Sequence, residues 1–259
     1  MISKKIKLKL DYFVEKYNTS DFIEDDPIGL VHNFKNQQDI EIFGLLMSTL
    51  SWGNRKAIIN SGKGLIEIMN NEPFYFIKKF SESDIDLLMG FKHRTFNVFD
   101  LQFFILQLQK IYTKNTSLEE VFSPSFKNSN NSMESISNFR KIFLGKYNTI
   151  RTKKHVANPA NGSAAKRLNM YLRWMVRDDD NGVDFGIWKN ISSSKLSCPL
   201  DVHSGNSARK LKLLSRTQND WKAVEELDRS LRILDPKDPV KYDFALFGLG
   251  IQNKIDNLI

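Results

Sequence analysis

The sequence contains a single cysteine, no long hydrophobic run and no internal repeat, and each absence excludes a class of protein. Cys198 stands alone among 259 residues, so the chain has no internal disulfide and no set of thiolates for a zinc or iron–sulfur centre. No segment approaches the roughly 18 consecutive apolar residues that a membrane-spanning helix needs. The basic start, residues 1–10, lacks the apolar core of a secretory signal. We therefore expect a cytoplasmic protein with no membrane partner.

What the chain does contain is an ordinary globular composition with an excess of positive charge. Hydrophobic residues make up 41% of it and charged residues 26%, so the chain can bury a sizeable core. The net charge of +8 and the isoelectric point near 9.4 favour an anionic partner, for which nucleic acid is the usual candidate. A solvated surface with an incidental basic excess is the alternative.

Apolar residues recur at helical spacing along nearly the whole chain. The stretch from Asp39 to Trp52 is apolar almost all round, which is typical of a central buried helix. No segment alternates between apolar and polar residues over a convincing length, so the pattern predicts an all-α protein. The expected helices cover residues 3–17, 39–52, 56–69, 85–89, 96–112, 133–144, 166–177, 201–214, 221–234 and 242–250.

The acidic run Asp178-Asp179-Asp180-Asn181-Gly182 is expected to be a solvated turn. It lacks the alternate-ligand spacing and the final glutamate of a calcium loop. The sequence therefore predicts no metal site and no cofactor.

Two short stretches carry residues suited to chemistry. In Pro199-Leu200-Asp201-Val202-His203, Asp201 precedes a helical segment, so its carboxylate is expected at the positive end of a helix. A purely capping role for Asp201 is the alternative. In the second stretch a small turn containing Gly162 opens a helix with Lys166 in its first turns.

Together these stretches resemble the helix-hairpin-helix superfamily of DNA glycosylases. In that superfamily a Gly-x-Gly-x-Lys hairpin opens the helix with the catalytic lysine, and a later Pro-x-Asp-x-His carries the catalytic aspartate. Here the hairpin reads Gly162-Ser163-Ala164-Ala165-Lys166. The chain is most similar to a bacterial family related to the compact 8-oxoguanine DNA glycosylase/lyase branch, which has no iron–sulfur cluster.

The resemblance implies a fold of two helical lobes packed as one globular unit, with an active-site cleft between them. Residues 35–180 are expected to form a helical barrel with a degenerate hairpin, and residues 1–34 plus 181–259 the second lobe. The implied activity is excision of a damaged base, an oxidised purine in the related branch, from double-stranded DNA by a monomeric enzyme, with an associated abasic-site lyase step.

The resemblance also implies roles for individual residues. Lys166 attacks C1′ of a flipped nucleotide and forms a Schiff base, while Asp201 stabilises the positive charge on the sugar or deprotonates the nucleophile. The expected DNA-binding residues are Gly162, Ser163, Ala164, Arg167, His203, Arg209 and Lys210. The expected residues around the flipped base or its orphaned partner are Trp52, Asn54, Arg55 and Phe247.

The hairpin departs from the superfamily pattern in two ways. Ala164 stands where the second glycine is expected, and the usual Leu-Pro ahead of the turn is missing. Both changes weaken the case for close contact between the backbone and phosphate. One alternative is therefore a non-catalytic nucleic-acid-binding module on a glycosylase-derived scaffold. Another is a helical protein with no nucleic-acid role.

Overall fold

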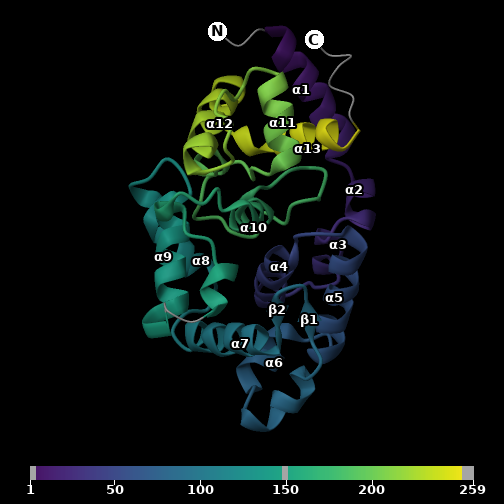
Figure 1. The fold of residues 1–259 in the computed structure, drawn as a ribbon, viewed down its shortest axis with the longest axis vertical. Coiled ribbons are helices and arrows are strands. Elements are labelled where there is room, and N and C mark those ends of the chain that lie inside the picture. The colour runs from purple at the N-terminus through teal and green to yellow at the C-terminus, as the bar shows by residue number, and fades with distance from the viewer. Residues whose placement is uncertain (1–3, 148–150, 253–259) are drawn as a thin grey trace.

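A computed structural model describes residues 4–147 and 151–252, and the chain is mostly helical within them (Figure 1). The expectation of an all-α protein is confirmed, apart from one two-stranded sheet. Among the described helices, none is both long enough and apolar enough to cross a membrane.

One end of the molecule is built mostly from the first half of the chain and continues to residue 161 (Figure 1). Its α-helices are α3 (Ile28–Val31), α4 (Gln37–Leu50), α5 (Arg55–Ile68), α6 (Pro73–Lys79), α7 (Val98–Tyr112), α8 (Glu119–Phe122) and α9 (Met133–Leu144). The 3-10 helices η1 (Glu82–Leu88), η2 (Ser123–Lys127), η3 (Gly145–Tyr147), η4 (Arg151–His155) and η5 (Pro159–Asn161) connect them.

Helix α4 is the buried helix that the sequence predicted, and every residue from Asp39 to Leu50 is buried. Its one deeply buried charge, Glu41, is compensated by hydrogen bonds. The carboxylate accepts from Tyr112 Oη at 2.6 Å and from Trp188 Nε1 at 2.7 Å. Glu41 therefore ties α4 to α7 and to the segment after α10.

The two strands β1 (Lys92–His93) and β2 (Phe96–Asn97) form an antiparallel hairpin that the sequence did not predict. Strand β2 occupies the first two residues of the segment 96–112 that was expected to be helical, and α7 begins only at Val98. Asn97 and Asp100 explain that start, because they form a reciprocal capping box at the helix N-terminus.

The other end combines α1 (Lys4–Tyr17) with α11 (Val202–Lys210), α12 (Trp221–Leu234) and α13 (Tyr242–Gln252), as Figure 1 shows. Helix α2 (Ser20–Asp25) leads away from this end, and η6 (Ser193–Lys195) and η7 (Pro239–Lys241) lie in the connections. Glycine permits close packing here. A side chain at Gly248 would lie 2.3 Å from the Tyr17 ring, and one at Gly250 would lie 2.8 Å from the His203 carbonyl.

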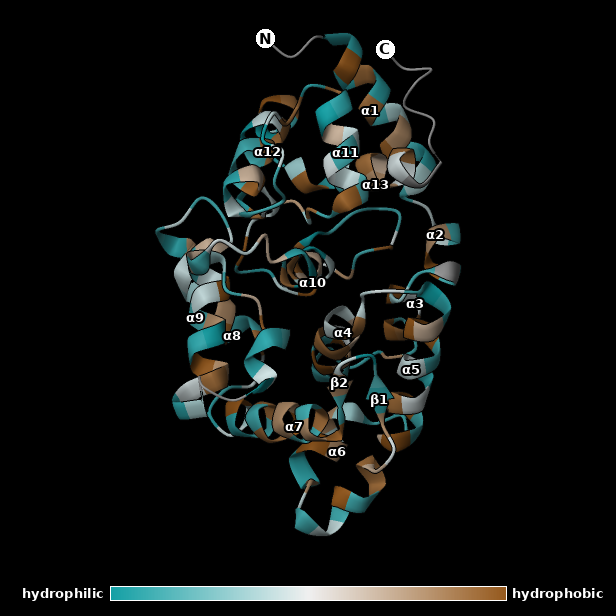
Figure 2. Ribbon diagram, in the orientation of Figure 1, coloured by the Kyte–Doolittle hydropathy of each residue, from teal (hydrophilic) through white to brown (hydrophobic). Residues whose placement is uncertain are grey.

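Helix α10 (Lys166–Val176) lies between the two ends (Figure 1) and packs on α4. Figure 2 shows hydrophobic and hydrophilic faces along the same helices, which agrees with a core made from helix stripes. The buried hydrophobic residues form one cluster that runs from Leu10 to Leu249. The predicted lobes, 35–180 against 1–34 plus 181–259, stay a prediction.

Candidate active site

Lys166 is the first residue of α10, and the turn before it places its side chain. Gly162 has φ +89° and Ala165 has φ +48°, so the backbone turns twice through the left-handed region. The Trp221 amide donates to the Gly162 carbonyl at 2.9 Å, which fastens the turn to the start of α12. The expected turn before the lysine helix is present, preceded by the short 3-10 helix η5 and not by an α-helix.

Two amide groups of this turn are already used within the protein. Gly162 N donates to the Pro159 carbonyl at 2.8 Å, and Ser163 N donates to the Asn158 carbonyl at 3.2 Å. Neither N–H is free for a phosphate oxygen. Beside Ala164, this is a second physical reason why the turn at residues 162–165 is poorly suited to binding phosphate through its backbone.

Asp201 caps α11, and its two carboxylate oxygens have different surroundings. Oδ1 accepts a hydrogen bond from the Ser204 amide at 3.0 Å, and the Ser204 hydroxyl accepts from the Asp201 amide at 2.9 Å. Oδ2 faces Lys166 Nζ at 3.9 Å. The Lys166 and Asp201 side chains are 28% and 24% exposed, so solvent and a ligand can still reach both. Capping therefore leaves one oxygen of Asp201 for chemistry.

Lys166 and Asp201 open into one cavity of about 520 Å³. That volume lies within the range of small-molecule and cofactor pockets, roughly 300–1,000 Å³. The cavity is enclosed by the α2–α3 connection, the turn between α4 and α5, and helices α10, α11 and α13. Its aromatic walls are Phe22, Trp52, Trp174, Phe244 and Phe247, and its charged residues are Asp26, Arg55, Lys166, Arg167, Arg173, Asp201 and Asp243.

Several residues expected from the sequence lie in this lining beside Lys166 and Asp201. They are Trp52, Arg55, Arg167, His203 and Phe247. Asn54 lies outside it, because its side chain caps α5 by accepting from the Ala57 amide at 3.2 Å. The hairpin residues Gly162, Ser163 and Ala164 and the α11 residues Arg209 and Lys210 also lie outside the lining.

Two of the expected DNA-binding arginines are engaged by the protein itself. Arg167 donates to the Thr49 carbonyl at the end of α4 and to the His155 carbonyl at 3.4 Å, and burial lowers its pKa to about 10. Arg209 donates to the Arg216 carbonyl at 2.8 Å and to Asn219 Oδ1 at 2.5 Å. Arg167 therefore holds the cavity wall to the end of α4, and Arg209 holds α11 to the segment before α12, which the basic pattern of the sequence did not reveal.

The Trp52 wall is held by the β1–β2 hairpin. The Arg94 guanidinium lies over the Trp52 ring at 4.4 Å from its centroid, and His93 Nε2 lies 3.3 Å from the Trp52 carbonyl oxygen. The β1–β2 hairpin thus fixes a residue of the cavity wall, although no structure was predicted for the residues that do so, which lie between the expected helices 85–89 and 96–112.

Sequence reasoning missed three charged residues of the cavity: Asp26, Arg173 and Asp243. Arg173 follows Lys166 by two helical turns, so helical periodicity places both on one face and could have drawn attention to it. Burial raises the pKa of Asp243 to about 6, with Arg173 opposing this shift and the nearby Asp201 charge adding to it. Asp26 and Asp243 come from distant segments, and no local pattern connects them to Lys166.

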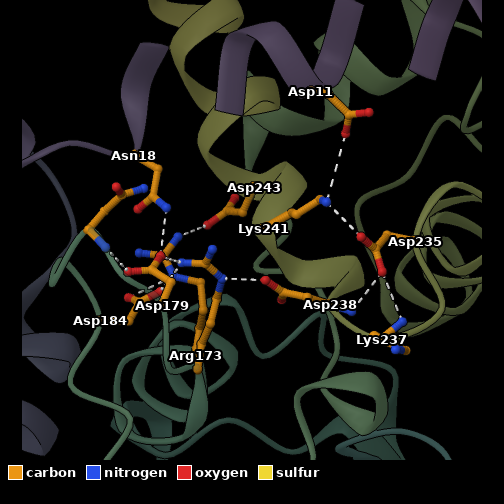
Figure 3. Close-up of polar contacts among 12 residues, drawn as sticks. Asp11, Asn18, Arg173, Asp179, Asp184, Asp235, Lys237, Asp238, Lys241 and Asp243 are labelled. Carbon is orange, nitrogen blue, oxygen red and sulfur yellow. Dashed lines mark hydrogen bonds and ion pairs between the residues drawn. The ribbon is translucent and has the colours of Figure 1, made fainter. Parts of the chain in front are cut away.

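The cavity residues Arg173 and Asp243 belong to a buried ion network (Figure 3). Arg173 donates to Asp243 at 2.5 Å and to Asp184 at 3.2 Å. Arg177, one turn further along, donates to Asp184 at 3.1 Å and to Asp238 at 2.8 Å. The network joins α10 to α13 and to the segments before α11 and α13. Within the described residues no group of histidine, cysteine, aspartate or glutamate is arranged to hold a metal ion.

The sequence matches the protein family described as "Protein of unknown function (DUF2400)" over residues 26–252. The chain belongs to this family. The matched range includes every charged residue of the cavity, from Asp26 to Asp243. No curated protein and no solved structure matches the chain.

Proposed function

We propose that this protein excises a damaged base from double-stranded DNA and cleaves the resulting abasic site, with Lys166 as nucleophile. The observation that carries the proposal is the pair formed by Lys166 Nζ and Asp201 Oδ2, 3.9 Å apart at a cavity of about 520 Å³. An amine and a carboxylate at this separation suit attack on C1′ of a nucleotide that has left the duplex. The aromatic lining suits a flat, extruded base.

The chemistry follows from the two side chains. The neutral Lys166 amine attacks C1′, and the glycosidic C1′–N bond breaks with its electron pair leaving on the base. While that bond breaks, the negative charge of Asp201 stabilises the positive charge developing on the sugar, and Asp201 Oδ2 then takes the proton that Nζ loses. The sugar ring next opens: the Nζ electron pair forms the C1′=N bond of a Schiff base, the C1′–O4′ bond breaks, and O4′ takes the proton held by Asp201. Loss of a C2′ proton from that iminium expels the 3′ phosphate and cleaves the strand.

The finer architecture belongs to the same proposal. We take α10 and the first-half helices as one lobe and α1 with α11–α13 as the other, so that the cavity lies in the cleft between them. The turn at residues 162–165 takes the place of the hairpin. Because the amides of Gly162 and Ser163 already donate to carbonyl groups of the protein, we expect phosphate to be bound by side chains around the cavity, such as the exposed Arg55.

The test is reduction of the Schiff base by borohydride. The protein is incubated with duplexes carrying 8-oxoguanine, an oxidised pyrimidine, uracil or an abasic site, and covalent adducts are counted. We expect an adduct on at least one base lesion, its loss in Lys166→Gln, and a decrease of about 100-fold in its rate of formation in Asp201→Asn. Lys189→Gln is the matched control, because Lys189 is 69% exposed and lies outside the cavity lining.

Other outcomes separate the rival functions. No adduct on any duplex, with binding intact, supports the non-catalytic nucleic-acid-binding module. Binding that does not weaken steeply between 50 and 200 mM salt, concentrations at which phosphate contacts lose about 10³-fold or more in affinity, contradicts any role on nucleic acid.

A further inference from the structure

Besides Asp201, the cavity holds two carboxylates for which the reaction above has no use, Asp243 and Asp26. Asp243 accepts a hydrogen bond from Arg173 at 2.5 Å, whereas no arginine or lysine donates to Asp26 within the described residues. Asp26 lies in the connection between α2 and α3 and lines the same cavity as Lys166. Its Oδ1 accepts a hydrogen bond from the Ile28 amide at 3.1 Å, which fixes the side chain. Among the described residues no donor bonds Oδ2, so this oxygen is available to a ligand.

We propose that Asp26 is the general acid of this site and donates a proton to the base as it leaves. The inference rests on the proposed function and adds a catalytic residue to it. A departing base carries the electron pair of the broken C1′–N bond, and protonating it makes it a better leaving group. An acid for this step must lie in the pocket that holds the base, apart from the carboxylate that faces the lysine. Asp26 meets both conditions.

The step balances in protons and electrons. The O–H bond of the Asp26 carboxyl breaks, and its proton goes to a ring nitrogen or carbonyl oxygen of the base while the C1′–N electron pair passes to the base. The base leaves neutral and Asp26 becomes a carboxylate. Arg55, Lys166 and Arg173 then stabilise the new negative charge, since all three act on Asp26 electrostatically.

The surroundings of Asp26 support its protonated form before the reaction. Burial raises the pKa of its carboxyl, against the opposing influence of the Ile28 amide and of the three cations. Asp201 has other surroundings, because its Oδ1 accepts a hydrogen bond from the Ser204 amide and its Oδ2 faces Lys166 Nζ.

Several charged or titratable groups from the surrounding elements line the same cavity and bear on its pH dependence. They are Arg55 of α5, Lys166, Arg167 and Arg173 of α10, His203 of α11, the α11 cap Asp201 and Asp243 of α13. Since the acid must hold its proton, the rate of base excision should fall as pH rises through the pKa of Asp26. Trapping on an abasic site has no leaving base and should lack this dependence.

The experiment compares wild type with Asp26→Asn in two reactions, single-turnover excision of the base lesion and borohydride trapping on an abasic duplex, between pH 5 and 9. Asparagine keeps an oxygen for the Ile28 amide but cannot supply the proton. We expect about 100-fold slower excision, loss of the alkaline decline, and abasic-site trapping within about threefold of wild type. Asp26→Glu, which keeps an acid, should recover part of the excision rate. Asp21→Asn, the same change at an exposed carboxylate of α2, is the matched control.

The outcomes distinguish this inference from the proposed function. Wild type that excises no base from any duplex overturns the glycosylase and the role of Asp26 with it. Wild type that excises while Asp26→Asn keeps the same rate and pH profile overturns only the role of Asp26. An equal loss in both reactions also overturns it, because Asp26 would then serve Lys166 or the fold and not the departing base.

Discussion

At the scale of single residues, Asp228 is a buried carboxylate with incomplete compensation. Its Oδ1 accepts from the Cys198 amide at 2.9 Å, whereas Oδ2 has no hydrogen bond among the described residues, with Arg232 at 3.8 Å. Burial raises the pKa of Asp228 to about 6, against the opposing charge of Arg232. The ionised form is therefore less favourable in the folded protein than in the unfolded chain.

This environment predicts a pH-dependent gain from Asp228→Asn. A folded-state pKa above the unfolded value contributes stability below about pH 4 that is lost as pH rises through about 6. Asparagine does not ionise, so the variant should gain on the order of 2 kcal/mol in unfolding free energy at pH 7 and little at pH 4. Urea unfolding at both pH values measures this. An equal change at the two pH values would show that packing, not ionisation, decides the effect.

That Lys166 and Asp201 face each other at one cavity could be predicted from sequence, and the other charged residues of that cavity could not. Lys166 and Asp201 each stand in a local pattern of turn, cap and helix, and the order of the two patterns indicates a known arrangement. Asp26 and Asp243 depend on the meeting of α2, α10 and α13, which no spacing along the chain encodes. Arg167 was predicted to contact DNA, and only the structure shows the carbonyl groups that hold it.

At the scale of elements, α5 offers a test of its packing because it contains two glycines two positions apart. A methyl group at Gly64 would have no atom within 4 Å among the described residues, whereas one at Gly62 would lie 2.5 Å from Leu30 Cδ1 and 2.6 Å from Met47 Sδ. Gly64→Ala should stabilise the protein by roughly 0.5–1 kcal/mol, because alanine loses less conformational entropy in a helix.

Gly62→Ala is the matched control for that prediction. Alanine at position 62 brings the same gain in helix propensity, but its methyl group would push Leu30 and Met47 away. We therefore expect the free energy of unfolding to fall by roughly 1–3 kcal/mol. Thermal unfolding of the two variants gives the sign of each change. If both were stabilised, α5 would not be packed against α3 and α4 as described.

Helices could be predicted where the hydrophobic pattern extends over many residues, and short elements could not. The apolar stretch of α4 predicted a buried helix whose observed start and end lie within about two residues of those expected. The strands β1 and β2 have two residues each, too few to show an alternating pattern. The expected helix at 85–89 is the 3-10 helix η1, since its short apolar run does not distinguish the two forms.

At the scale of the whole molecule, α10 connects the two ends both by packing and by charge. Its residues Tyr171 and Trp174 belong to the single hydrophobic cluster that reaches from α1 to α13. Arg177, the residue that follows its last helical residue, is 3% exposed and binds Asp184 and Asp238. Because both ends share one hydrophobic core and are joined by ion pairs through α10, we expect the whole protein to unfold in one step. This expectation does not depend on where the boundary between the predicted lobes lies.

We therefore expect a single calorimetric unfolding transition, and a large effect from breaking the network. Arg177→Met removes one of the two cations that bind the buried Asp184 and the cation that binds Asp179 and Asp238, which costs about 3–5 kcal/mol and lowers Tm by roughly 6–15 °C. Lys189→Met removes an ion pair of 2.6 Å whose side chains are 69% and 68% exposed, so its Tm should stay within about 2 °C of wild type.

Two resolved transitions in wild type would show that the ends fold independently. A split only in Arg177→Met would show that the network, and not the shared core, makes unfolding cooperative.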